Sequence, residues 1–365
     1  MQLDAIFPTF VKRQLPSVLM VYLSPVLALV LTLLAGSLLF FVMSVSPLEA
    51  LRAFFISPLS SWYGLSELAV KATPLVLIGV ALSLGFRAGV WNIGAEGQLI
   101  VGGLCGGAVA LYFYQQQGFY ILPLILLAGT AGGMAWAAIV AFLRTRFNAN
   151  EILTSLMLSY VASLLINLMV NGPLKDPDGY NFPESRLFSD SALLPVMFEG
   201  TRLHIGVLIA LTVVALGWLM LSRSLAGYQI RVMGSAPAAA QHAGFSTNKI
   251  IWMTLLIGGG ISGLAGTIEV TGPIGQLLPN ISPGYGFTAI IVAYVGRLHP
   301  LGSLLAGLLL ALTYLGGETA QINLGLPVAV TGVFQGMLLF FLLASDVLIH
   351  YRLEFGHAAR QQEAG

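Results

Sequence analysis

Long apolar segments alternate with shorter polar segments along almost the whole chain. A helix needs about 20 consecutive apolar residues to cross the hydrocarbon core of a bilayer. The pattern therefore predicts ten membrane helices, of which the eighth is short enough to be a half-helix. The apolar segments cover approximately residues 19–45, 68–86, 93–114, 120–143, 152–170, 203–221, 250–270, 287–295, 301–315 and 327–349.

The composition agrees with this pattern, since 57% of the 365 residues are hydrophobic and only 8% are charged. Soluble domains carry about 25% charged residues. We predict an all-α polytopic membrane protein in which residues 1–365 form one transmembrane domain. In each half a Gly-rich break precedes a helix, and residues 92–103 show a weak match to residues 283–296, so we expect two inverted pseudo-repeats with some helices broken. A net charge of +1 argues against a nucleic-acid partner.

The distribution of basic residues predicts the orientation. Cytoplasmic loops carry an excess of Lys and Arg. With ten spans, eleven of the 16 Lys and Arg residues fall on the side of the N-terminus. We therefore expect both termini, and the long polar segment 222–249, to lie in the cytoplasm. The other long polar segment, 171–202, is expected outside.

A polar stretch, residues 85–98, separates two of the apolar segments and contains four glycines and several charged or amide side chains. In one interpretation Asn92, Glu96 and Gln98 line the route of a polar solute, and the four-residue spacing of Asn92 and Glu96 would place them on one helix face. In the other, Glu96 pairs with Arg87 and joins two helices. Trp91 is either part of the pathway or an interface anchor.

Other polar residues fall at the ends of apolar segments. Glu269, at the predicted outer end of the seventh segment, either lines the pathway or faces water. Tyr285, in the following Gly-rich break, is included among the pathway candidates. The five histidines all fall in loops or at segment ends, so we expect solvated surface positions for them.

The cytoplasmic segment contains an alanine-rich sequence between a proline and a glycine. Pro237 suits the first turn of a helix, and Gly244 suits a left-handed residue after its end. A helix of about two turns is not stable alone in water, so it needs a partner surface. A helix lying on lipid is disfavoured, because large apolar residues and Lys or Arg are missing. The candidate coupling residues are Gly234, Ser235, Pro237, Ala238, Ala239, His242 and Gly244.

Sequence signatures of catalysis are absent. No GxxxxGK[ST] phosphate loop, HExxH or GxSxG motif occurs, and the single cysteine, Cys105, allows no internal disulfide. We therefore predict that the chain is not an enzyme, that it has no ATPase site of its own and that it holds no metal.

Residues 86–98, Phe-Arg-Ala-Gly-Val-Trp-Asn-Ile-Gly-Ala-Glu-Gly-Gln, resemble the signature of ATP-binding-cassette (ABC) importer permeases of the nucleoside and simple-sugar group, relatives of the ribose and branched-chain amino-acid permeases. The later segment is similar to that family's coupling segment at Gly234, Pro237, 238–240 and Gly244, with Ala236 in place of the usual Asn and Phe245 in place of Ile. Residues 283–287 resemble the second half of the family.

The resemblance implies a membrane subunit that forms the translocation pathway for a nucleoside or a related small polar solute, such as a simple sugar or a nucleobase. It implies separate ABC ATPase subunits that bind ATP and Mg, a second permease chain, either identical or a paralogue, and an external solute-binding protein, in the cell's inner (plasma) membrane. The alternative is a stand-alone secondary transporter or channel for a small polar solute.

Overall fold

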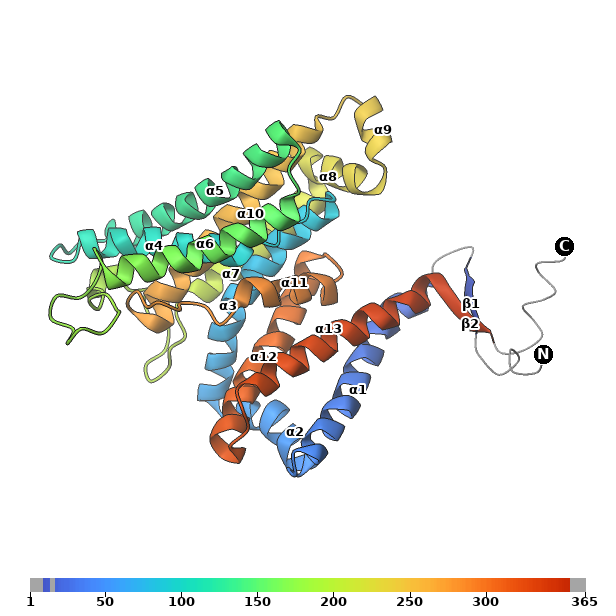
Figure 1. Ribbon diagram of the computed structural model, residues 1–365, viewed down its shortest axis with the longest axis horizontal. Coiled ribbons are helices and arrows are strands. Elements are labelled where there is room, and N and C mark those ends of the chain that lie inside the picture. The colour runs from blue at the N-terminus through green and yellow to red at the C-terminus, as the bar shows by residue number, and fades with distance from the viewer. Residues whose placement is uncertain (1–8, 14–16, 355–365) are drawn as a thin grey trace. The chain divides into compact units, whose positions relative to one another are not determined.

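The computed structural model describes residues 9–13 and 17–354, and in this part of the chain the structure is predominantly helical (Figure 1). Nine of the described helices are long and apolar enough to cross a membrane, and one shorter apolar helix, Tyr285–Val295, lies between the seventh and eighth of them. These helices coincide with the ten predicted segments, so the fold class is confirmed. The inverted repeat stays a prediction.

The helices have the following bounds. The long apolar ones are α1 (Val18–Val42), α3 (Trp62–Arg87), α4 (Ala95–Tyr112), α5 (Ile121–Phe147), α6 (Glu151–Asn171), α7 (Gly206–Arg223), α10 (Thr247–Glu269), α12 (Pro300–Leu324) and α13 (Ala329–His350). The shorter elements are α2 (Pro47–Phe55), α8 (Leu225–Ser235), α9 (Pro237–His242), α11 (Tyr285–Val295), the 3-10 turns η2 (Ser57–Leu59) and η3 (Asp190–Ala192), the π-helical turn η4 (Val270–Ile274), and the strands β1 (Thr9–Lys12) and β2 (Tyr351–Glu354).

Two helix boundaries differ from the prediction by more than five residues. Helix α3 begins at Trp62, six residues earlier than expected, because Ser61 caps it by accepting a hydrogen bond of 3.0 Å from the N–H of Gly64. Helix α12 continues to Leu324 and does not end at residue 315. Glu318 and Gln321, which fall beyond that residue, are therefore exposed positions on a helix.

The chain divides into two compact units. The first consists of residues up to Ser57 and from Gly316 onward. Its centre is a cluster of three buried aromatic rings, Phe40, Phe54 and Phe334, whose centroids lie 5.1–5.7 Å apart. Strands β1 and β2 pair antiparallel in the same unit.

The second unit, residues 58–315, is built on close packing of α4, α5 and α10. Glycines form the contact surfaces: a Cβ added to Gly102 would lie 2.2 Å from the Cα of Gly263, and one added to Gly133 would lie 2.2 Å from the carbonyl oxygen of Gly259. Thr267 also donates from its hydroxyl to the Gly102 carbonyl at 3.2 Å. The GxxxG spacings Gly102/Gly106 and Gly103/Gly107 of α4 permit this close helix contact.

Helix α10 sets the distance between the two ends of this unit. Its 23 residues span about 35 Å at 1.5 Å per residue, slightly more than the hydrocarbon core of a bilayer. Helix α9 precedes α10, whereas the segment after α10 binds the long loop 172–205 through hydrogen bonds such as Leu194 N–H to Thr271 O at 2.9 Å. Helix α9 and the long loop therefore lie at opposite ends of the unit (Figure 1).

Candidate functional site

The polar stretch before α4 is closed by a pair of buried amides. The Nδ2 of Asn92 donates to Oε1 of Gln98 at 3.0 Å, and the Nε2 of Gln98 donates back to Oδ1 of Asn92 at 3.1 Å. That Oδ1 also accepts the N–H of Gly94. Because α4 begins only at Ala95, Asn92 lies outside the helix, and the prediction that it shares a helix face with Glu96 is wrong. The two amides hold the shape of the break.

Glu96 is directed to the start of another helix. Its buried carboxylate accepts the N–H of Gly286 at 2.6 Å, and Ser282 and Gly284 also hydrogen-bond to it. These groups form the N-terminal turn of α11, where unpaired N–H groups and the helix dipole favour a negative charge. Glu96 therefore fixes α11 to α4.

Arg87 takes a different partner from the one considered in the sequence. Its Nε donates to the carbonyl oxygen of Leu298 at 2.6 Å, in the turn between α11 and α12. Since Glu96 is bound to the start of α11, the alternative in which Glu96 pairs with Arg87 is wrong. The polar stretch joins α11 at both ends, through Glu96 at its start and through Arg87 just after its end.

Trp91 belongs to a group of three aromatic rings. Its ring centroid lies 5.1 Å from that of Phe86 and 6.2 Å from that of Tyr294. Trp91 is 39% exposed, so its side chain is partly accessible to solvent. The ring therefore packs the end of α3 against α11, and one face of it remains accessible.

A charged pocket of about 200 Å³ lies between α3, the segment before α7 and the end of α10. Arg202 donates from Nε to Oε1 of Glu67 at 2.9 Å and from Nη2 to the other carboxylate oxygen, so the pair is bidentate. The Glu67 side chain is buried, whereas that of Arg202 is about half exposed. The pocket is lined by Glu67, Val70, Lys71, Arg202, Glu269, Pro273, Ile274 and Tyr285.

Two of the predicted pathway residues meet in this pocket. Glu269 is half-buried, and the charges of Lys71 and Arg202 act on its carboxylate. Tyr285 is buried and begins α11, the helix whose first turn is held by Glu96. Trp91, Asn92, Glu96 and Gln98 do not line the pocket. The polar stretch 85–98 therefore supports the wall formed by Tyr285, because its Glu96 holds the first turn of α11.

His204 is a residue that sequence reasoning placed incorrectly. It is 2% exposed, not solvated, because it packs against Gly206 and Gly272, which have no side chains. Its Nδ1 accepts the N–H of Gly206 at 3.2 Å, and its Nε2 has no hydrogen-bond partner among the described residues. Burial lowers the pKa of His204 to about 4, against the smaller opposite effect of the Glu67 charge. The imidazole is therefore neutral at physiological pH.

The alanine-rich segment forms α9 as predicted. Pro237 occupies the first turn, and Gly244 has a φ of +76°, the left-handed conformation expected after the helix end. Except for the buried Ala240, the residues of α9 are exposed, including the predicted Ala238, Ala239 and His242. His242 Nδ1 lies 2.8 Å from the carbonyl oxygen of Ala238.

Gly234 and Ser235 are the last two residues of α8. Ser235 donates from its hydroxyl to the carbonyl oxygen of Arg231 at 2.9 Å. Gly234 touches the end of α3, since a Cβ there would lie 1.9 Å from the carbonyl oxygen of Arg87. The coupling segment and the polar stretch are therefore in direct main-chain contact.

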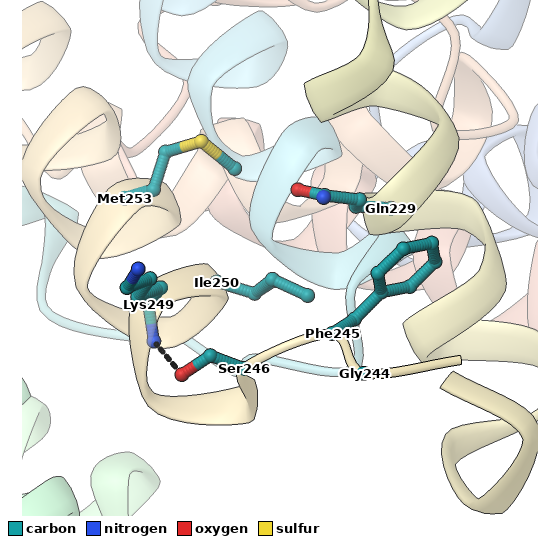
Figure 2. Close-up of a pocket in the computed structure, with 7 residues that line it drawn as sticks. All are labelled: Gln229, Gly244, Phe245, Ser246, Lys249, Ile250 and Met253. Carbon is teal, nitrogen blue, oxygen red and sulfur yellow. Dashed lines mark hydrogen bonds between the residues drawn. The ribbon is translucent and has the colours of Figure 1, made fainter. Parts of the chain in front are cut away.

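A hollow of about 170 Å³ adjoins α9 (Figure 2). It lies between α8 and the first turns of α10, and Phe245, which packs edge-on against Tyr228 at 6.1 Å, forms part of its wall. Ser246 caps α10 by accepting the N–H of Lys249 at 3.4 Å. The residues that line it are Gln229, Gly244, Phe245, Ser246, Lys249, Ile250 and Met253.

Comparison with known proteins identifies relatives over nearly the whole chain. A family model described as "Branched-chain amino acid transport system / permease component" matches residues 64–343. The chain is 35% identical to a glucose ABC transporter permease protein of Haloferax volcanii over 97% of this chain and 95% of that one. It is 30% identical to a guanosine ABC transporter permease protein of Bacillus subtilis (88% and 93%). It is 24% identical to a nucleoside ABC transporter permease protein of Lactococcus lactis (94% and 96%).

Proposed function

The chain belongs to the permease-component family of branched-chain amino acid transport systems and is the membrane subunit of an ABC importer, and we propose that it carries a nucleoside or a simple sugar. Its relatives are named as permeases for glucose, guanosine and nucleosides, which supports this class of solute. The importer would contain a second permease chain and ATPase subunits, and an external binding protein would deliver the solute.

The observation that supports coupling to an ATPase subunit is the exposed helix α9. All but one of its residues face outward, and its six residues are too few for a helix that is stable without support. The segment lacks the large apolar residues and the Lys or Arg residues of a helix that lies on lipid. A surface of an ATPase subunit would cover it, and the adjoining hollow would receive a side chain of that subunit.

ATP and Mg would be bound by the partner subunits. The sequence offers no phosphate loop, so hydrolysis must reach this chain as a movement. Basic residues at the α9 end of the second unit, such as Arg144, Arg223 and Lys249, support a cytoplasmic position for α9 in the inner membrane. The cytoplasmic positions proposed for the two chain ends fall on residues outside those that the structure describes.

The loop at the other end of the unit is suited to receive the binding protein. Arg186 forms ion pairs with Asp176 at 3.3 Å and Asp178 at 2.9 Å and lies over the ring of Tyr114 at 5.7 Å. These interactions give the loop a defined surface of mixed charge. The pocket of Glu67, Arg202 and Glu269 opens at the same end, next to the place where solute would be released.

Contacts in the second unit connect the two ends of this mechanism. Movement of α9 would act through Gly234 on the main chain at Arg87. Arg87 holds the carbonyl of Leu298, just after α11. The start of α11 is held by Glu96 and carries Tyr285 in the pocket wall. A displacement of α9 is therefore transmitted to the pocket through few contacts.

A valine at position 244 tests the coupling role. Gly244 has a φ of +76° and no atom within 4 Å of an added Cβ, so Gly244→Val strains the backbone by about 1–2 kcal/mol without a clash. The strain should shift α9. The purified complex in proteoliposomes should then hydrolyse ATP but lose at least 90% of ATP-driven uptake.

Gly325→Val is the matched control. Gly325 also has a positive φ, +65°, and open space around it, but it lies between α12 and α13. This variant should retain coupled uptake. Normal uptake by Gly244→Val, or equal loss in both variants, would reject the role of α9 in coupling.

A further inference from the structure

The pocket lined by Glu67, Lys71, Arg202, Glu269 and Tyr285 combines two carboxylates and two cations with an aromatic side chain. We propose that it binds the hydroxyl-bearing ring of a sugar, either a free sugar or the sugar part of a nucleoside. This inference rests on the proposed function and makes it more specific.

The charges of the pocket favour a neutral ligand. The carboxylates of Glu67 and Glu269 balance the cations of Lys71 and Arg202, so the formal charges sum to zero. An anionic or cationic ligand would leave one charge without compensation in a partly buried site, which is unfavourable. A neutral polar solute disturbs no balance.

The hydrogen-bonding groups favour hydroxyls. Both carboxylate oxygens of Glu67 accept hydrogen bonds from Arg202, whereas the carboxylate of Glu269 makes no hydrogen bond among the described residues. A carboxylate only accepts and an ammonium only donates, but a hydroxyl does both. One hydroxyl can therefore donate to Glu269 and accept from the ammonium of Lys71.

The remaining wall is apolar and suits the carbon face of a ring. Val70, Pro273 and Ile274 contribute alkyl groups, and Tyr285 contributes a buried aromatic side chain that packs edge-on against Tyr314 at 5.5 Å. A sugar ring presents hydroxyls at its edge and C–H groups on its face. The pocket provides partners for both.

The volume limits how much of a solute can enter. The pocket has a volume of about 200 Å³. Pockets that enclose a drug-sized ligand measure about 300–1,000 Å³. One sugar ring fits, and the base of a nucleoside would remain outside, beyond the half-exposed Arg202.

Equilibrium binding to the whole importer tests the inference. Tritiated glucose, guanosine and guanine are each titrated against the complex in nanodiscs without the binding protein, for the wild type and for Glu269→Gln. A hydrogen bond to a charged group is worth about tenfold or more in affinity. We expect wild type to bind glucose or guanosine, Glu269→Gln to weaken that binding about tenfold or more, and guanine binding to be the same in both.

Two controls make the result specific. Glu184→Gln removes a carboxylate at the same end of the protein, one that accepts from Gln276 at 3.1 Å outside the pocket, and should leave all affinities unchanged. The permease and ATPase subunits should elute together on size-exclusion chromatography for wild type and for both variants, which shows that the complex is intact.

Each other outcome overturns the inference. These are no binding of glucose or guanosine to wild type, unchanged affinity in Glu269→Gln, an equal loss for guanine, or the same loss in Glu184→Gln. The proposed function fails separately, if ATP-driven uptake of sugars and nucleosides by the wild-type complex is absent.

Discussion

The loss of folding stability at acidic pH should depend in part on one buried histidine, His204. His204 has a pKa near 4 in the folded protein because burial disfavours its charged form, and an unfolded histidine has a pKa of about 6.5. The folded state therefore binds fewer protons than the unfolded state between these values. The contribution of His204 to the free energy of unfolding is fully present above pH 6.5 and is lost as the pH is lowered toward 4. Stability increases with pH wherever the unfolded state binds more protons.

The size of the effect follows from the two pKa values. Lowering the pH from 8 to 5 should cost the folded state about 2 kcal/mol through His204 alone. The assay is guanidinium-induced unfolding of the detergent-solubilised protein at the two pH values, followed by tryptophan fluorescence. Because carboxylates also titrate, the informative quantity is the difference between wild type and His204→Gln.

Between pH 8 and pH 5 the free energy of unfolding should fall by about 2 kcal/mol less in His204→Gln than in wild type, since glutamine has no proton to gain in this range. His242→Gln, the same exchange at an exposed position of α9, serves as the control and should keep the wild-type pH dependence. An identical pH dependence in wild type and His204→Gln would refute the argument that the folded protein holds His204 neutral.

Two further substitutions test the packing of the second unit. Glu96→Ala should destabilise the protein by about 2–3 kcal/mol in the same unfolding assay, because it leaves the N–H of Gly286 without its charged acceptor; a loss below 0.5 kcal/mol would show that the contact is dispensable. Gly266→Ala should cost about 1–3 kcal/mol, because its Cβ would lie 2.0 Å from the carbonyl oxygen of Leu99. Gly258→Ala in the same helix, with no contact closer than 3.5 Å, should be neutral or stabilising, and equal effects of the two alanines would contradict the packing.

The sequence predicted those features whose signal is local. Apolar length located the helices, because a span must satisfy its backbone within itself. The proline and the glycine around α9 marked its two ends correctly, since each acts through its own φ angle. The GxxxG spacings of α4 permit close helix contact, but they do not indicate that Gly102 meets Gly263.

Features that depend on distant residues could not be predicted in this way. Glu67 and Arg202 are 135 positions apart, and nothing near either residue indicates the other. The prediction that Asn92 and Glu96 share a helix face assumed that the helix begins before Ala95, where α4 begins in the structure. His204 is buried because two glycines of distinct segments leave room for its ring, and a sequence does not show which glycines face a given side chain.

The contact of α4, α5 and α10 has a consequence for the route of the solute. Where Gly102 meets Gly263 and Gly133 meets Gly259, main chain touches main chain, and no layer of side chains remains that could part to admit water. Such an interface has a single register and does not open in steps. These three helices therefore form a sealed partition, and a solute cannot pass between its members.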